Sequence, residues 1–137
     1  MFNELAVWGL WVIIATLVVQ WLVASTVKAK TPNAVPGKMN SDLGPESFVF
    51  RAHRTYMNSI ENFPLIIGAV VVAYLAQAGT TLVTACVWTY ALARIVYTVW
   101  YYTVATEKNP SGRSAIFGIG VLANLTLLLG SAYYLIP

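Results

Sequence analysis

The sequence predicts an all-α integral membrane protein, a four-helix bundle in a single domain. Of its 137 residues, 58% are hydrophobic and only 9% are charged, whereas a soluble domain carries about 25% charged residues. The mean hydropathy is +0.68. A membrane-spanning helix needs about 20 mostly apolar residues. Four apolar stretches approach or exceed that length, at about residues 3–27, 47–77, 82–104 and 114–135.

The first stretch, residues 3–27, holds few polar side chains, with Thr16 and Gln20 in its interior. A secretory signal peptide is the alternative, but it has a basic start and an apolar core of about 7–15 residues. Here Glu4 is the only early charge, and the apolar run is longer. We therefore expect a retained transmembrane helix.

The second stretch, residues 47–77, is polar in its first half and apolar from Phe63 onward. It follows a segment rich in proline and glycine, residues 28–46, which is typical of a loop. The third stretch follows after only residues 78–81, so the second and third helices should be antiparallel neighbours. A polar segment, residues 106–112, separates the third stretch from the fourth.

Basic residues lie near the first and third connections, whereas residues 78–81 carry no charge; the basic residues concerned are Lys28, Lys30, Lys38, Lys108 and Arg113. Cytoplasmic loops carry an excess of lysine and arginine. We expect these two connections in the cytoplasm and both termini outside or in a lumen. The membrane would be a bacterial inner membrane or one of the endoplasmic reticulum type.

Several function classes are excluded by composition. A net charge of +3 does not suggest a nucleic-acid-binding protein, which gathers Lys and Arg on one solvated face. With one cysteine, Cys86, and one histidine, His53, we expect no disulfide and no metal site. Cys86 lies in an apolar run and is interpreted as a packing thiol. The sequence also lacks a glycine-rich phosphate loop and a G-x-S-x-G motif.

The second helix carries a stripe of charged and polar residues. At 100° per residue its members fall within an arc of about 80°: Arg51, Arg54, Asn58 and Glu61. His53 points elsewhere. Lipid does not tolerate such a face, so it must turn into a bundle, a water-filled cleft or another subunit.

A second stripe, on the third helix, holds Tyr90, Arg94, Tyr97 and Tyr101 within about 60°. Arg94 lies near mid-membrane and needs a partner, and Glu61 is the candidate within the chain. A packing salt bridge is the simplest interpretation of Arg94. Arg113, at the start of the fourth helix, is either a membrane-surface anchor or a group that binds an anion or a thiolate.

Together these residues predict a cationic pocket at one membrane face. Arginines can fork onto carboxylates, Glu61 can pair with an ammonium, and the tyrosines can donate hydrogen bonds. A tripeptide such as glutathione, with two carboxylates and one ammonium, satisfies this set. The residues alone do not separate it from another zwitterionic anion.

Two motifs resemble the MAPEG family, the membrane-associated proteins in eicosanoid and glutathione metabolism, which include microsomal glutathione transferases and eicosanoid synthases. The first is R-A-H-R-x-x-x-N-x-x-E-x-x-P at residues 51–64, and the second is R-x-x-Y-x-x-x-Y at residues 94–101. Length and four-helix topology also agree. The chain departs from the mammalian pattern in a longer stretch from Tyr101 to Arg113 and in Asn62, where a tyrosine stands in some members.

The resemblance implies a homotrimer that binds glutathione, as substrate or cofactor, between subunits near the cytoplasmic face. It implies that Arg113 is catalytic and stabilises the thiolate. Arg94 keeps its interpretation as a structural polar residue of the bundle, and no metal is expected. The glutathione-binding residues would be Lys28, Arg51, Arg54, Asn58, Glu61, Tyr97, Tyr101 and Ser114.

The function implied is a membrane glutathione transferase for detoxification, which joins glutathione to lipophilic electrophiles and could also act as a peroxidase on lipid hydroperoxides. The lipophilic molecule or lipid would arrive from the bilayer. Two alternatives stay open. One is a non-enzymatic lipid-binding protein of the same family, which lacks such arginines as Arg54 and Arg113. The other is a small multidrug transporter, which needs a central acid in its first helix; here there is none.

Overall fold

The computed structural model describes residues 3–136, and in them it has four helices: α1 (Glu4–Ala29), α2 (Phe48–Leu75), α3 (Thr80–Thr103) and α4 (Gly112–Tyr133). All four are long and apolar enough to cross a membrane. The prediction of an all-α, multi-pass membrane protein is therefore confirmed.

The helix ends depart from the expected bounds by one or two residues, because backbone geometry rather than hydropathy ends a helix. The clearest case is the end of α2. Gln77 has a positive φ of 53°, and the Ala78 N–H donates to the Ala73 carbonyl at 2.9 Å. This left-handed turn closes α2 at Leu75 and satisfies carbonyls that the helix end would leave free.

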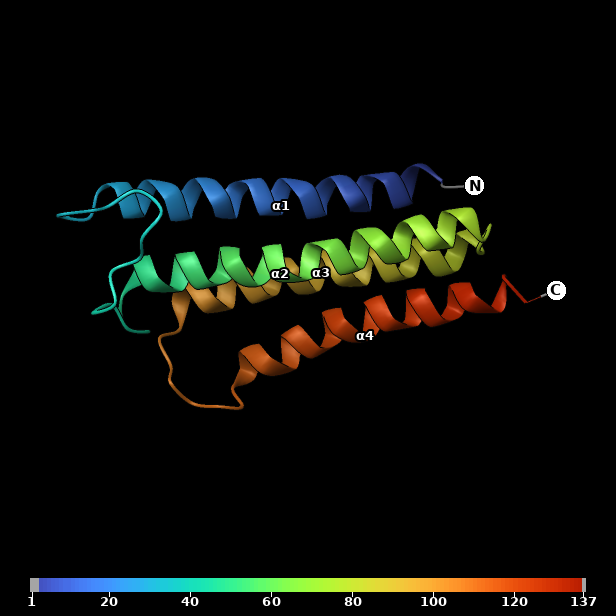
Figure 1. The fold of residues 1–137 in the computed structure, drawn as a ribbon. Helices are drawn as coiled ribbons and strands as arrows, with labels where there is room; N and C mark the ends of the chain where they lie inside the picture. Colours follow the sequence, from blue (N-terminus) through green and yellow to red (C-terminus); the bar gives the residue numbers. More distant parts are fainter. Residues whose placement is uncertain (1–2, 137) are drawn as a thin grey trace.

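The helix α3 is the centre of the bundle, because it packs against α1, α2 and α4. Within residues 3–136, α1 and α4 flank it without touching each other. Figure 1 shows the α1–α2 and α3–α4 connections at one end, and both termini with the α2–α3 turn at the other. The second and third helices are antiparallel neighbours, as their short connection predicts.

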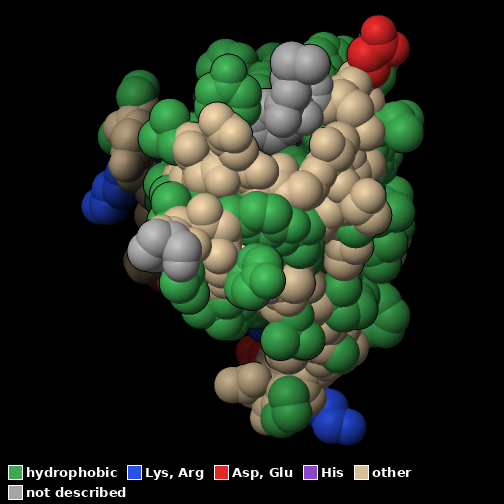
Figure 2. Space-filling model, turned by 90° about the vertical axis from the view of Figure 1, so that its right-hand side faces the viewer, with side chains coloured by type: hydrophobic (Ala, Val, Ile, Leu, Met, Phe, Trp, Pro, Cys, Tyr) green, Lys and Arg blue, Asp and Glu red, His purple; other side chains and the backbone are tan. Residues whose placement is uncertain are grey.

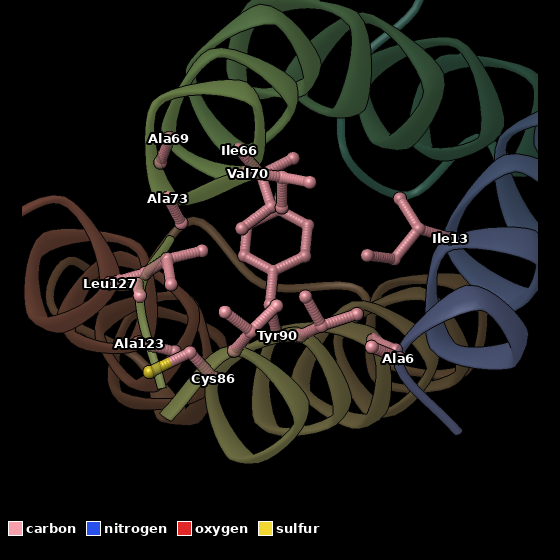
Figure 3. Packing of buried hydrophobic residues seen from close by; sticks show 14 residues of the cluster. Ala6, Ile13, Ile66, Ala69, Val70, Ala73, Cys86, Tyr90, Ala123 and Leu127 are labelled. Atoms are coloured by element: carbon pink, nitrogen blue, oxygen red, sulfur yellow. The ribbon is translucent and has the colours of Figure 1, made fainter. Parts of the chain in front are cut away.

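The core lies where the central helix meets the other three (Figure 3). The Tyr90 ring of α3 lies beside Ile66 and Val70 of α2, with Leu127 of α4 on one side and Ile13 of α1 on the other. Cys86 is a buried free thiol of this cluster. Small buried residues let the helices approach closely, which is how membrane helices pack when water does not drive them together; they include Ala6, Ala69, Ala73 and Ala123.

The outer faces of the flanking helices are apolar and exposed. On α1, Trp8 and Trp11 are more than half exposed, at 56% and 59%, and on α4 Leu122 and Leu129 are exposed at 64% and 69%. Figure 2 views the end with the termini, where hydrophobic side chains, other uncharged side chains and backbone cover most of the face and most of the visible charged side chains lie at its margin. The exposed apolar faces along the sides of α1 and α4 suit a lipid solvent.

One glycine sets the distance between α1 and α3. A Cβ on Gly9 would lie 2.7 Å from Cγ1 of Val87 and 3.3 Å from Nε1 of Trp88, and a β-branched valine has little rotamer freedom to yield. We expect Gly9→Ala to destabilise the protein by about 1–3 kcal/mol through overpacking. Gly118→Ala is the matched control, because its Cβ would meet nothing within 4 Å. The Gly118→Ala variant should have the parent's melting temperature in detergent or a higher one. An equal fall in melting temperature in both variants would contradict a close approach of α1 and α3 at Gly9.

Candidate functional site

The first arginine of the α2 stripe holds the end of the bundle together. Arg51 is only 9% exposed, and its Nη1 donates to the carbonyls of Pro45 and Glu46, each at 2.8 Å. Its Nη2 donates to the Tyr102 carbonyl at 3.3 Å. The guanidinium therefore ties the loop before α2 to the end of α3.

The second buried arginine, Arg94 of α3, is 5% exposed. Its Nη1 donates to Oδ1 of Asn58 at 2.9 Å, and its Nη2 donates to Oγ of Ser59 at 2.6 Å. The guanidinium also lies 4.5 Å from the centre of the Tyr97 ring. The expected pairing with Glu61 is wrong. Asn58 and Ser59 lie on the side of α2 that faces α3, whereas Glu61 is on an exposed flank of the helix.

The third arginine, Arg113, lies in the first turn of α4. Its guanidinium carbon is 4.4 Å from the centre of the Tyr101 ring, a distance at which a cation is attracted to the ring face. The Tyr101 ring packs edge-on against Tyr97, with centroids 5.9 Å apart. Arg113 is thus held in place by an aromatic column that continues from Arg94 and Tyr97.

Five of the predicted site residues meet around one hollow of about 170 Å³, which lies between α2, α3 and α4. The hollow is lined by Arg54, Tyr97, Tyr101, Arg113, Ser114 and Phe117. The Ser111 N–H donates to Oγ of Ser114 at 3.3 Å, so the Ser114 hydroxyl hydrogen is left for another acceptor. Two cations, two phenols and a hydroxyl there make a receptor for an anion.

The other predicted site residues lie outside this hollow in a single chain. Lys28 lines a separate hollow at the α1–α2 connection, together with Lys38. Arg51 is engaged by carbonyls, and Asn58 contacts Arg94. Glu61 is exposed two helical turns after Arg54, on the same stripe of α2.

Sequence reasoning missed Phe117 and the polar partners of Arg94. Phe117 lies one helical turn after Arg113, so helical spacing alone would place it on the same face. Ser59 carried no such signal, because a serine in a helix can equally bond to the backbone of its own helix. Among residues 3–136 no cluster of His, Cys, Asp and Glu could hold a metal ion.

The fold and this hollow define a small four-span membrane protein with a cationic, tyrosine-lined pocket near one end of the bundle. The model of the MAPEG family matches residues 5–133, nearly the whole chain, and the protein therefore belongs to the MAPEG family. Its members are mostly glutathione-dependent membrane enzymes. Neither the curated proteins nor the solved structures include a match.

Proposed function

We propose that the protein is a membrane glutathione transferase that conjugates glutathione to lipophilic electrophiles. The observation that carries the proposal is the convergence of Arg54 and Arg113, from different helices, on one hollow lined by Tyr97 and Tyr101. Guanidinium groups bind carboxylates in forked pairs, and glutathione brings two carboxylates. Family membership supports the same ligand.

The proposed chemistry is a substitution in which the thiolate is the nucleophile. A cation beside the sulfur lowers the thiol pKa and raises the thiolate fraction. Arg113 is the cation we assign to this role, because the Tyr101 face fixes its guanidinium at the pocket wall. The sulfur forms a thioether bond to the electrophilic carbon, the leaving group departs with the electron pair, and the thiol proton goes to solvent.

The proposed active unit is a homotrimer, in which a neighbouring subunit completes the pocket. Ligand pockets have volumes of about 300–1,000 Å³, whereas this hollow has about 170 Å³. In addition, Arg54 and Glu61 are exposed on a helix that spans the membrane, and charged groups there need a protein partner. Lys28 and Glu61 would then reach glutathione across the subunit boundary.

The lipophilic substrate would reach the site from the bilayer. An apolar groove of about 280 Å³ runs between α1 and α3, with Trp11, Val19, Ile95 and Val99 among its lining residues. The α1–α2 and α3–α4 connections, which hold the basic residues, would face the cytoplasm, where glutathione is available. The groove also suits the alternative, a lipid-binding protein without catalysis.

The test uses the purified protein in detergent micelles. We expect native mass spectrometry to show three copies, calorimetry to show saturable glutathione binding, and chlorodinitrobenzene to be conjugated at a rate proportional to protein. A glutathione analogue that lacks the thiol should bind but support no conjugation. A stable oligomer that binds a fluorescent lipid but no glutathione would establish the lipid-binding alternative instead. Drug-driven proton flux in liposomes would indicate a transporter.

A further inference from the structure

A small cavity with apolar and polar lining residues lies deep between α1, α2 and α3, apart from the hollow already described. It has a volume of about 10 Å³ and is lined by residues that include Gln20, Ser59, Tyr90 and Arg94. Gln20 is 0% exposed and Arg94 is 5% exposed. Two polar atoms of these side chains, Oε1 of Gln20 and Nε of Arg94, have no hydrogen-bond partner among the described residues.

The hydrogen bonds around Gln20 determine which end of its amide is free. The Thr98 hydroxyl donates to the Arg94 carbonyl at 2.7 Å, so its single hydrogen is used. Its oxygen can then only accept, and the Gln20 group 2.6 Å away must be the Nε2 donor. Oε1 is therefore the atom left for the cavity, and it needs a donor.

The two free atoms require an occupant that both donates and accepts. Nε of Arg94 carries a hydrogen and needs an acceptor, whereas Oε1 of Gln20 needs a donor. An anion would only accept and an ammonium would only donate. Water does both, and about 10–15 Å³ is the room that one water molecule needs. Ser59 of α2 and Tyr90 of α3 also line the cavity and carry hydroxyls that could serve as further partners.

We infer that this cavity binds one ordered water molecule that bridges Gln20 and Arg94, and that Gln20 is a positioning residue for the glutathione site. The Arg94 guanidinium is then held on one side by the water, which Gln20 of α1 orients, and on the other by Asn58 and Ser59 of α2. Gln20 is itself anchored through Thr98, whose hydroxyl bonds the backbone carbonyl of Arg94. With Nε satisfied, the guanidinium plane is fixed, and the amide of Asn58 is fixed with it. The positioning role rests on the proposed function; the water site does not.

The first experiment is a structure of the full protein at a resolution that shows ordered water. We expect density between Gln20 Oε1 and Arg94 Nε in the parent and its loss in Gln20→Met, which is similar in length but has no acceptor for the water. Absence of the density in the parent, or a protein group bonded to Nε, would overturn the water site. This result does not depend on whether the protein binds glutathione.

The second experiment measures glutathione affinity and turnover in the same variants. We expect Gln20→Met to weaken glutathione binding on the order of tenfold with little change in kcat. Thr16→Val is the control, because Thr16 also lines the cavity but its hydroxyl already donates to the Val12 carbonyl; this variant should bind glutathione like the parent. If Gln20→Met does not fold, Thr98→Val removes the anchor of the amide and should give the same loss. A lower melting temperature with unchanged affinity would overturn the positioning role, whereas a parent that binds no glutathione would overturn the proposed function.

Discussion

Replacing Arg113 with alanine should lower the rate of glutathione conjugation at neutral pH by about 10- to 100-fold. An opposite charge within about 4–6 Å lowers an acid's pKa by about 1–3 units, and each unit changes the thiolate fraction up to tenfold. Arg113 is the cation best placed for this, at the start of α4 and 4.4 Å from the Tyr101 ring centre. The measurement is kcat/KM with chlorodinitrobenzene for parent and variant.

The pH dependence separates this role from a loss of binding. Without Arg113 the bound thiol should ionise near the ordinary value of about 8.5, so the variant's rate should rise steeply between neutral pH and that value. The parent, whose thiol is already ionised, should change little over the same interval. Lys108→Ala is the control, since Lys108 is an exposed basic residue of the α3–α4 connection, outside the hollow. Equal profiles for parent and Arg113→Ala would remove Arg113 from the mechanism.

The fold was predictable because a membrane imposes one strong rule on the sequence. Each span must satisfy its own backbone and present apolar side chains to lipid, so four long apolar stretches suffice to locate four helices. The order of packing was not predictable. That α3 lies at the centre depends on many small contacts, such as Gly9 against Val87, and hydropathy does not record them.

The candidate site was predictable to the level of the helix face but not of the individual partner. Helical spacing grouped Arg51, Arg54 and Glu61 on one stripe. In the structure, however, Arg51 donates hydrogen bonds to backbone carbonyls, whereas the other two side chains are exposed. The same limit explains the error on Arg94. Charge complementarity favours a carboxylate, but the rotation of α2 brings Asn58 and Ser59 to it instead.

The neutral partners of Arg94 have a consequence for ligand binding. Among residues 3–136 its guanidinium contacts an amide, a hydroxyl and the face of Tyr97, none of which carries a negative charge. A buried cation is costly unless its charge is compensated, and attraction between charges is stronger away from bulk water. The Tyr97 ring also borders the hollow that holds Arg54 and Arg113. An anion in that hollow would therefore be attracted by three guanidinium groups rather than two.

The second large effect should come from substitutions of the two arginines of α2. We expect the substitution of Arg51 to lower the stability of the protein and that of Arg54 to lower its affinity for glutathione. Arg51→Met should destabilise the protein by about 2–4 kcal/mol, because it removes charged donors from three carbonyls at the end of the bundle. Arg54→Ala should leave the melting temperature unchanged, since Arg54 is exposed. The Arg54→Ala variant should instead bind glutathione about 10- to 100-fold more weakly, which is the contribution of one hydrogen bond between charged groups to the affinity.

The contrast rests on geometry, so the conservative substitutions should also differ. Arg51→Lys should not restore stability, because one ammonium cannot reproduce the fork that reaches the carbonyls of Pro45, Glu46 and Tyr102 at once. Arg54→Lys should recover part of the glutathione affinity, since a point charge still attracts a carboxylate. Thermal unfolding would measure the stability of these four variants, and calorimetry would measure their affinity for glutathione. If Arg51→Met kept the parent's melting temperature and lost glutathione affinity, Arg51 would be a ligand-binding residue. The assignment of a structural role to Arg51 and a binding role to Arg54 would then be wrong.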